Sequence, residues 1–514
     1  MDIRARLGLV GLFLILSASA WAAQPATSPT FTVTPRGREL LSASLVFCEK
    51  NWDDRAAMVT SPGGVDPSPD DPRQHRVRET VWYALGLVLR NEPGDLVRAG
   101  RAIDAVLAQQ FNAPGQRWDG TFRRGVEESD PPAKGAKMWE HYDPNWRQFV
   151  GTTLALILIR GGDRLPADLV ARMERAIARA VEGELADKRL KPGYTNIALM
   201  HGFLWSWAGQ RLGKADWVTN GEAWCQAVHQ LWATHRAFDE YNSPTYYGVD
   251  LYGLALWREF GPTDKIRTLG AEMEAGLWRD IGDYYHAGLK NVCGPFDRSY
   301  GMDMRRYVAL TGVWIGLVVP AELTPLPDPT KPMAHGHDFF CVPTYVALNL
   351  QVPAEAAASF RRFQGARQLT RPISGPRVAT AWIGENLMLG GEITGNTRGA
   401  NKATSQFHPA TIHWRAPGDD VGWMRLFASP NCDAKAEAGL LTVTSAAPGD
   451  FTYRLCVRGL KTENLSKDQW TMPGLRVQVE TDAKEIQTQA GKDYVDVTYK
   501  DATRFALRAK ASLR

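Results

Sequence analysis

Five short stretches of the chain concentrate the residue types that bind and transform sugars. They are RWDGTFRRG (117–125), MWEHYDPNWRQF (138–149), GYTNIALMHGF (193–203), FDEYNSPTYYG (238–248) and GPFDRSYGMDMRRY (294–307). Each combines aromatic rings, on which sugar rings stack, with groups that donate hydrogen bonds or carry charge. If the fold brings these stretches together, they form one carbohydrate-binding cleft.

The aromatic and charged side chains of these stretches are the predicted substrate-binding residues. The rings would form flat walls, and the arginines can hold a carboxylate by paired hydrogen bonds. For a single tryptophan the alternative is a place in the core between helices, and for the arginines it is ion pairing with neighbouring aspartates at a solvated helix end. The predicted set is Trp118, Trp139, His141, Tyr142, Asp143, Trp146, Asp297, Arg298, Tyr300 and Arg306.

The fourth stretch has the pattern of a helix start. Ser243 is a suitable N-cap and Pro244 suits the first helical position. Tyr247 then belongs to an apolar stripe with the following leucines, which assigns it to the core, whereas Tyr246 lies on the face that we expect to meet the cleft. Glu240, just before the helix, is either a favourable charge at the helix N-terminus or a member of the site.

Acidic residues are frequent in the same stretches and allow a second kind of chemistry. A glycoside hydrolase needs two carboxyl groups, one protonated as the acid and one ionised as the base or nucleophile. On this interpretation Asp143 or Glu240 would pair with Asp297 or Asp303. The full set of acids is Glu140, Asp143, Asp239, Glu240, Asp250, Asp297 and Asp303.

The elements that must position these residues are helices. Between about residues 34 and 320 the apolar residues recur with the helical period, most clearly at Leu169, Met173, Ile177 and Val181. We expect helical hairpins packed side by side as an incomplete (α/α) toroid, with a compact bundle as the alternative. The expected helices span roughly 36–49, 78–91, 97–110, 146–160, 165–185, 196–211, 215–234, 244–260, 264–283 and 303–319.

Beyond about residue 372 the apolar period becomes two, which is typical of half-buried antiparallel strands. Runs at 377–383, 386–391, 411–415, 421–428, 439–444, 451–457, 475–480, 495–499 and 504–508 predict a C-terminal antiparallel β-sandwich. The sequence thus predicts an α+β multidomain protein. Its expected divisions are a signal peptide (1–23), a toroid catalytic domain (24–325), a linker (326–371) and the sandwich (372–514).

Composition and the N-terminus indicate an exported protein. The chain has 514 residues and a net charge of only +4, and it lacks a basic run, which excludes a nucleic-acid partner. Arg4 and Arg6 precede a short apolar run and small residues at 17–23, the pattern of a cleaved signal peptide. We therefore expect a periplasmic or secreted protein without a membrane span after signal removal, and the oligomeric state is left open. In such a compartment Cys432 and Cys456 are the most favourable pair for a disulfide, with buried unpaired thiols as the alternative.

The order of TNIALMH, a helix of about twenty residues and then DEYNSPTYYGVDLYGL resembles the heparinase II/III-like polysaccharide lyases. The family's E-x-x-S-x-x-Y spacing falls on Glu240, Ser243 and Tyr246. The resemblance implies that Tyr246 occupies the place of the catalytic tyrosine and Asn196 that of the asparagine that neutralises the substrate carboxylate. His201 departs from the pattern, because five helical residues place it about 140° around the helix from Asn196.

The resemblance also implies that a histidine of the sandwich reaches the cleft, and His408 in TSQFHPATIHWR is our choice over His413. The base would be His408, His201 or Tyr246, with Arg305 as a further charge stabiliser. For either sandwich histidine a structural role is the alternative.

No cofactor is required by this chemistry. Some relatives carry a structural zinc in the sandwich region, and AHGHDF supplies His335 and His337 for a zinc or calcium ion, although a third ligand is not evident from the sequence.

Three functions remain open from the sequence. We prefer a polysaccharide lyase that cleaves an acidic, uronic-acid-containing polysaccharide or oligosaccharide by β-elimination. A toroid glycoside hydrolase that uses an Asp/Glu pair is the alternative, and a glycan-binding protein without catalytic activity is the third.

Overall fold

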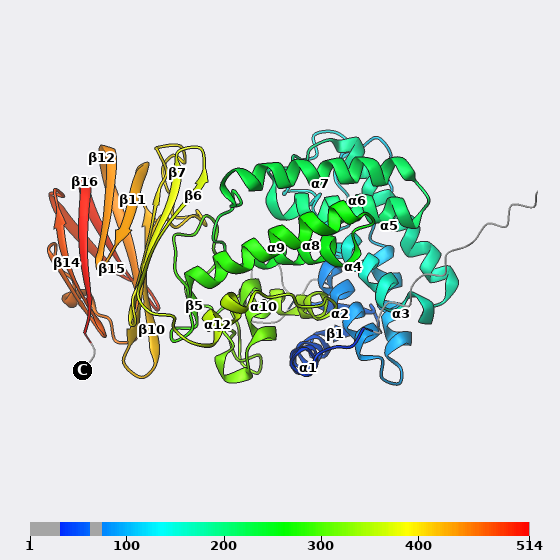
Figure 1. The fold of residues 1–514 in the computed structure, drawn as a ribbon, viewed down its shortest axis with the longest axis horizontal. Coiled ribbons are helices and arrows are strands. Elements are labelled where there is room, and N and C mark those ends of the chain that lie inside the picture. The colour runs from blue at the N-terminus through cyan, green and yellow to red at the C-terminus, as the bar shows by residue number, and fades with distance from the viewer. Residues whose placement is uncertain (1–30, 62–74, 513–514) are drawn as a thin grey trace, which may run out of the picture. The chain divides into compact units, whose positions relative to one another are not determined.

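The computed structural model describes residues 31–61 and 75–512. The predicted signal peptide, residues 1–23, lies outside the described residues. Helices come first along the chain and strands last, as Figure 1 shows by the change from blue and green to yellow and red. The predicted fold class, a helical toroid followed by an antiparallel β-sandwich, is confirmed.

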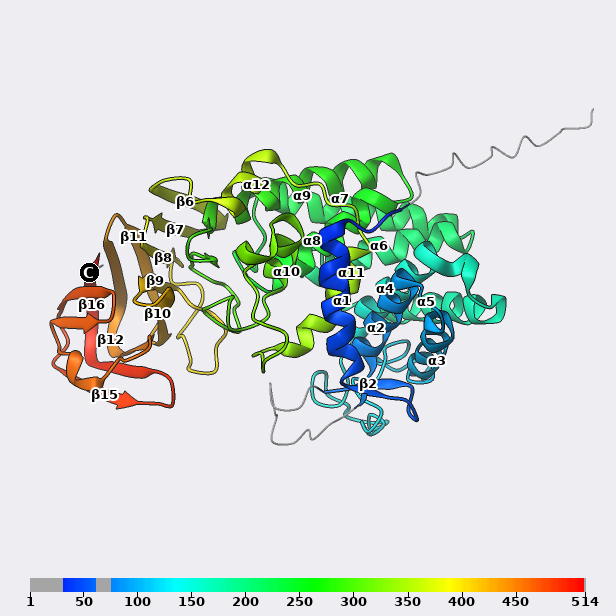
Figure 2. The ribbon, with the colours of Figure 1, turned by 90° about the horizontal axis from the view of Figure 1, so that it is seen from below.

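The toroid has an inner ring of helices in which each packs on the next. In order around the ring these are α2 (Val77–Arg90), α4 (Trp146–Gly161), α6 (Thr195–Arg211), α8 (Tyr246–Phe260) and α10 (Leu310–Val318). Two further helices, α1 (Pro35–Glu49) and α11 (Val342–Val346), pack on each other and close the ring between α10 and α2 (Figure 2).

Outer helices form hairpins with the inner ones because short loops join each pair. They are α3 (Asp95–Leu107), α5 (Ala167–Asp187), α7 (Ala215–His235) and α9 (Asp264–Tyr284), with α12 (Ala354–Arg361) packed on α9. The stripe Leu169, Met173, Ile177 and Val181 of α5 is buried, as its spacing predicts. Within residues 31–61 and 75–512, no helix combines the length and the apolar character needed to cross a membrane.

Short strands complete the helical part. They are β1 (Trp52–Asp53), β2 (Met58–Thr60) and β3 (His75–Arg76) in one small sheet, and β4 (Tyr285–His286) and β5 (Asn291–Val292) in another. Residues 326–371, for which we expected a linker, contain the 3-10 helix η3 (Gly336–Cys341) as well as α11 and α12. Phe339, Phe340 and Tyr345 bury this segment against the inner ring.

The sandwich is built from one antiparallel sheet that folds over itself. Its strands are β6 (Arg367–Ser374), β7 (Arg377–Ile383), β8 (Leu387–Ile393), β9 (Ala410–Ala416), β10 (Asp420–Ala428), β11 (Cys432–Glu437), β12 (Leu440–Cys456), β13 (Gln469–Met472), β14 (Leu475–Thr481), β15 (Glu485–Ala490) and β16 (Val495–Ala511). The long strands β12 and β16 take part in both layers, because the register of their pairing shifts between Thr444 and Phe451. The two expected strands at 439–444 and 451–457 are therefore the two halves of β12.

The six cysteines lie in the described residues and are all buried and unpaired. The bridge that we considered between Cys432 and Cys456 is absent because of strand register. Cys432 on β11 lies opposite Ser445, whereas Cys456 lies at the far end of β12, opposite Trp423 on β10. A disulfide requires its two Cα atoms within about 7 Å.

Candidate active site

A cavity of about 510 Å³ lies at the N-terminal ends of the inner-ring helices. Arg78 is the second residue of α2, Trp146 begins α4, Asn196 is the second residue of α6, Tyr246 begins α8 and Leu310 begins α10. Helix N-termini carry partial positive charge and unpaired backbone N–H groups. The ring therefore directs five such termini at one space, which favours a negatively charged ligand.

The hydroxyls of Tyr246 and Tyr300 meet on one wall of this cavity, with 2.6 Å between the two oxygens. Arg298 lies over the ring of Tyr246, with its guanidinium carbon 4.1 Å from the ring centroid. One of its nitrogens donates to the Tyr300 hydroxyl at 3.5 Å. A proton can thus pass between the two phenols, and negative charge on either oxygen lies close to a guanidinium.

Glu240 holds two of the cavity residues in place. Its Oε2 accepts from the Asn196 amide at 2.8 Å, and its Oε1 accepts from Arg298 at 3.0 Å. Arg298 also donates from Nε to Gln406 Oε1 at 2.6 Å. Since Glu240 contacts both Asn196 and Arg298 from behind the cavity lining, it fixes the orientation of both side chains toward the cavity.

The start of α8 follows from its sequence. Ser243 Oγ accepts from the backbone N–H of Tyr246 at 3.0 Å, so it caps the first turn although the helix begins at 246 rather than at the predicted 244. Tyr247 is buried and donates to Asp280 at 3.2 Å, whereas Tyr246 lines the cavity. The two tyrosines therefore lie where the sequence predicts, Tyr247 in the core and Tyr246 at the cavity. Only glycine fits at position 248, because a Cβ there would lie 2.4 Å from the backbone carbon of Leu310 at the start of α10.

The protonation states of Tyr246 and Arg298 follow from their burial and from the neighbouring charges. Burial raises the pKa of Tyr246 well above its usual range, and Tyr300 raises it further, while Arg298 acts in the opposite direction. Tyr246 is thus a phenol rather than a phenolate near neutral pH, which suits a proton donor. Burial alone would lower the pKa of Arg298, but Tyr246, Tyr300 and Glu240 raise it, so the guanidinium stays charged.

The cavity lining also carries a second charged group, formed by Arg78, Asp143, His337 and Asp338. Burial raises the pKa of Asp143, in spite of the nearby guanidinium of Arg78. Arg78 is half-buried, and its guanidinium carbon lies 4.6 Å and 4.5 Å from the ring centroids of Trp82 and Trp146. His337 Nε2 lies 3.6 Å from Asp338 Oδ1.

Aromatic rings form the rest of the wall. Trp139, which is 49% exposed, and Trp146 both line the cavity, as expected for stacking residues, and Tyr194 lies beside them. Trp139 adopts a positive φ of 70°, which is uncommon for a bulky residue and is found at constrained sites. Trp118 and Tyr142 lie elsewhere, in a small buried cluster with Phe111.

Of the remaining predicted residues of the first four stretches, His201 and His141 are not on the cavity lining. His201 is buried between Trp205 and Trp224, and burial lowers its pKa to about 4. It is therefore a neutral core residue. His141 is half-buried, and its ring accepts from the backbone of Lys137.

The two sandwich histidines are also buried. Burial and the charge of Arg425 lower the pKa of His408, whose Nε2 accepts from Arg425 at 3.0 Å. His413 donates to the Met302 carbonyl at 2.8 Å, and burial lowers its pKa to about 4. Neither ring lines the cavity. The backbone of His408 instead pairs with Phe296 and so joins the sandwich to the loop that carries Arg298.

The other charged residues predicted for the site, Arg305, Arg306 and Asp297, lie outside the cavity lining and form ion pairs. Arg305 and Arg306 both pair with Asp303 and with Asp420. Asp297 forms ion pairs with Arg377 and Arg398. The alternative stated for the arginines was ion pairing on a solvated helix end. Arg305 and Arg306 do pair with Asp303, but this aspartate is buried and lies outside any helix.

Sequence reasoning missed Arg78 and assigned Asp338 no role beyond its place beside two histidines. Arg78 and Trp82 are four residues apart in VRETVWYALG, so they share a helix face. An arginine at the start of a helix that is otherwise mainly apolar after its first turn is the signal that could have identified this part of the cavity.

Comparisons with known proteins give the following matches. Residues 38–350 match the family model described as Domain of unknown function (DUF8769), and residues 368–502 match the one described as Domain of unknown function (DUF8770). No curated protein matches the sequence.

Among solved structures, heparinase III is similar with a TM-score of 0.48 at 10% identity, over 93% of this chain and 85% of that chain. A point mutant of chondroitin AC lyase from Streptomyces coelicolor A3 has a TM-score of 0.38 at 10% identity, with 95% and 81% covered. Endoglucanase CelQ from Clostridium thermocellum, with cellobiose and cellotriose, has a TM-score of 0.26 at 10% identity, with 93% and 92% covered.

Proposed function

The chain belongs to the family described as Domain of unknown function (DUF8769), and we propose that it is a carbohydrate-active enzyme, a polysaccharide lyase that cleaves an acidic glycan by β-elimination. The observation that carries this proposal is the contact between the Tyr246 and Tyr300 hydroxyls beneath Arg298, on the same cavity as Asn196. This group supplies a proton donor, a proton acceptor and a site for a carboxylate.

The positive character of this wall supports a uronic-acid substrate. The N-termini of five inner helices, the Arg298 guanidinium and the Asn196 amide all favour a carboxylate at this position. β-Elimination requires that this carboxylate be neutralised, because the proton to be removed lies on the neighbouring carbon.

In the proposed reaction Tyr300 acts as the base and removes the proton from the carbon beside the carboxylate. The electron pair left on that carbon forms a double bond to the next carbon, and the glycosidic C–O bond breaks. Tyr246, which is a phenol, donates its proton to the departing oxygen.

The tyrosine pair also restores the starting state. After the reaction Tyr300 carries a proton and Tyr246 is ionised. One proton transfer between the two oxygens, 2.6 Å apart, returns the pair to its original state, and Arg298 stabilises the phenolate on either side.

A glycoside hydrolase is the second candidate, because Asp143 and Asp338 line the same cavity. Burial raises the pKa of Asp143, as an acid catalyst requires, while Asp338 would take the role of base or nucleophile. On this alternative, the Asp143→Asn variant loses activity while Tyr246→Phe keeps it. If the protein is a lyase, Tyr246→Phe loses activity and Asp143→Asn keeps it.

Product chemistry distinguishes the candidates. The purified protein is incubated with a panel of acidic and neutral polysaccharides, and ultraviolet absorbance and reducing ends are followed together. A lyase yields an unsaturated uronate that absorbs, whereas a hydrolase yields reducing ends without absorbance. Binding without either signal would indicate a glycan-binding protein and would overturn both catalytic proposals.

We also propose export to the periplasm or the exterior, on the strength of the N-terminal pattern at residues 1–23. N-terminal sequencing of the protein recovered from a periplasmic or culture fraction tests this proposal. A protein that starts at Met1 would contradict it.

A further inference from the structure

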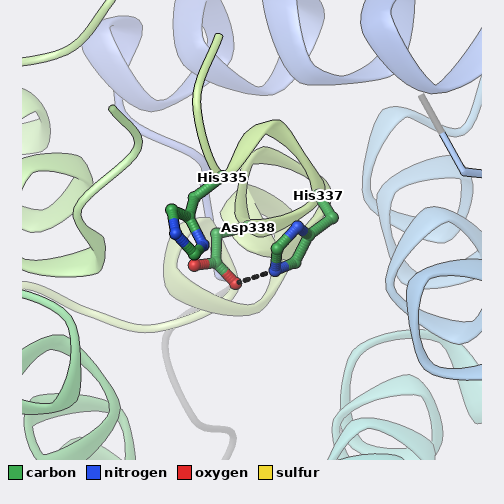
Figure 3. Close-up of side chains that lie close together, drawn as sticks. All are labelled: His335, His337 and Asp338. Atoms are coloured by element: carbon green, nitrogen blue, oxygen red, sulfur yellow. Dashed lines mark ion pairs between the residues drawn. The ribbon is translucent and has the colours of Figure 1, made fainter. Parts of the chain in front are cut away.

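We propose that His335, His337 and Asp338 bind a divalent transition-metal ion, with Zn²⁺ as the preferred ion, at the wall of the cavity. One ligand atom from each residue lies within 4.8 Å of the other two. Figure 3 shows the carboxylate of Asp338 between the two imidazole rings. The cluster lies on η3 and the residue before it, ahead of the first sandwich strand, so it is separate from a zinc site within the sandwich.

The distances suit a tetrahedral ion. Zinc bonds of about 2.0–2.1 Å to nitrogen and oxygen place neighbouring ligand atoms about 3.3–3.5 Å apart. His337 Nε2 and Asp338 Oδ1 are already 3.6 Å apart. The remaining separations, of up to 4.8 Å, require a side-chain adjustment on binding.

Asp338 provides independent evidence for a missing cation. The residue is 6% exposed, and its Oδ2 is buried without a hydrogen-bond partner in the described part of the chain. A buried carboxylate oxygen without a partner is costly and is rarely left so. Arg78 lies close enough for its charge to attract Asp338, but none of its nitrogens donates to Oδ2.

The donor set selects the kind of metal. Two imidazoles and one carboxylate suit zinc and neighbouring transition metals, whereas Ca²⁺ and Mg²⁺ prefer sites made of oxygen alone. Of the two metals considered from the sequence, this geometry favours zinc over calcium.

Three protein ligands leave one position of a tetrahedral ion open, as in catalytic rather than structural zinc sites. Because His337 and Asp338 line the cavity, the open position faces it. His335 stacks on Tyr300, with 4.5 Å between the ring centroids and 27° between the planes, so the site adjoins the tyrosine pair. If the proposed function holds, a carboxylate or hydroxyl oxygen of the sugar would fill the open position.

Metal binding is measured on the full metal-stripped chain without substrate, so the result does not depend on the lyase proposal. Calorimetric titration is expected to show one Zn²⁺ per chain and no comparable binding of Ca²⁺. Elemental analysis of the protein as purified identifies which transition metal it retains.

The variant His337→Ala should weaken Zn²⁺ binding by more than about 100-fold, since even an outer-shell partner contributes about 10–100-fold. The matched control is His229→Ala, which removes another histidine beside a carboxylate, Glu272 at 3.1 Å. The control should bind like the original protein. Equal affinity in all three proteins, or loss of binding in the control alone, overturns the site.

Cobalt provides a test that needs no substitution. Co²⁺ in a four-coordinate nitrogen and oxygen site gives intense visible absorption, whereas six-coordinate Co²⁺ on the protein surface gives weak bands. Intense bands that Zn²⁺ displaces at one equivalent support the proposal. Weak bands only, or no stoichiometric binding, refute it even if His337→Ala fails to fold.

Discussion

The hydroxyl oxygens of Tyr246 and Tyr300 lie 2.6 Å apart, although 54 residues separate the two tyrosines along the chain. Tyr246 begins α8, and Tyr300 lies on the loop that precedes α10. Arg298, on the same loop, covers the Tyr246 ring and is held by Glu240. On the proposed mechanism the two tyrosines act as one proton-exchanging unit, which the first two predictions test.

Removal of the Tyr246 hydroxyl should abolish proton donation. We expect Tyr246→Phe to lower kcat by about 10²–10⁴ with little change in KM, because general acid catalysis contributes about that factor. Steady-state kinetics on the active polysaccharide measure the effect. Tyr247→Phe is the matched control, since it removes a buried hydroxyl that bonds Asp280 and should cost stability of about 0.5–1.5 kcal/mol but not activity. Full turnover in Tyr246→Phe would sink the assigned role.

Tyr300→Phe should cause a loss similar to that of Tyr246→Phe, because either change breaks the proton exchange. The double variant should be only slightly worse than each single one, as residues that act as a unit are strongly non-additive. Kinetics of the four proteins form a double-mutant cycle. Effects that multiply in the double variant would show that the tyrosines act independently.

Glu240 should act by positioning rather than by proton transfer. Glu240→Gln removes the charge that holds Arg298, and a charged hydrogen bond contributes about 1.5–3 kcal/mol, so kcat/KM should fall about 10–150-fold. Asp239→Asn, which changes the exposed neighbouring acid, should leave kcat/KM unchanged. If Glu240→Gln eliminates activity while Asp143→Asn does not, Glu240 is itself a catalytic acid.

Buried neutral histidines should make the fold sensitive to acid. Burial lowers the pKa of His201 to about 4 from 6.5, so its contribution to stability is present above pH 6.5 and is lost as the pH falls toward 4. In His201→Phe the difference in unfolding free energy between pH 7 and pH 5 should shrink by about 2 kcal/mol. Denaturant titrations at the two pH values measure it. His413, whose pKa is also about 4, allows the same experiment, and an unchanged difference in both variants would contradict the argument.

Close packing of α8 on α10 should not tolerate a side chain at Gly248. A Cβ would lie 2.4 Å from the Leu310 backbone, so Gly248→Ala should destabilise the fold by about 1–3 kcal/mol. In Gly100→Ala the nearest atom lies 3.6 Å away, and this change within α3 should stabilise the fold by about 0.5–1 kcal/mol. Denaturant unfolding compares the two variants, and a neutral Gly248→Ala would show that the helices can separate.

Most helices were predictable because their apolar stripes are local and periodic. The interval 264–283, for example, was expected and α9 spans Asp264–Tyr284. The interval 303–319 was too long. Residues 303–309 form a loop instead, where Asp303 accepts from Asn291 and pairs with Arg305, and this contact between distant residues has no periodic signal.

The site was predictable in part. The residue types of the five stretches identified Tyr246, Arg298 and Tyr300, and the family resemblance added Asn196; the structure places all four on one cavity. Composition could not tell these residues from His408, whose ring is buried against Arg425. Which side chain faces a cavity depends on how whole helices and strands pack, and no local pattern records that.

The sequence by itself determined the helices, the alternating strands and the chemical character of the site, because these depend on the order and type of neighbouring residues. Only the tertiary structure decided that five helix N-termini meet at one cavity, that Tyr300 pairs with Tyr246, and that the local cluster of His335, His337 and Asp338 lies beside that pair. The physical reason is that these contacts are made by residues on different elements. Their positions depend on how all the helices of the ring pack together, and the sequence of a single helix does not determine that.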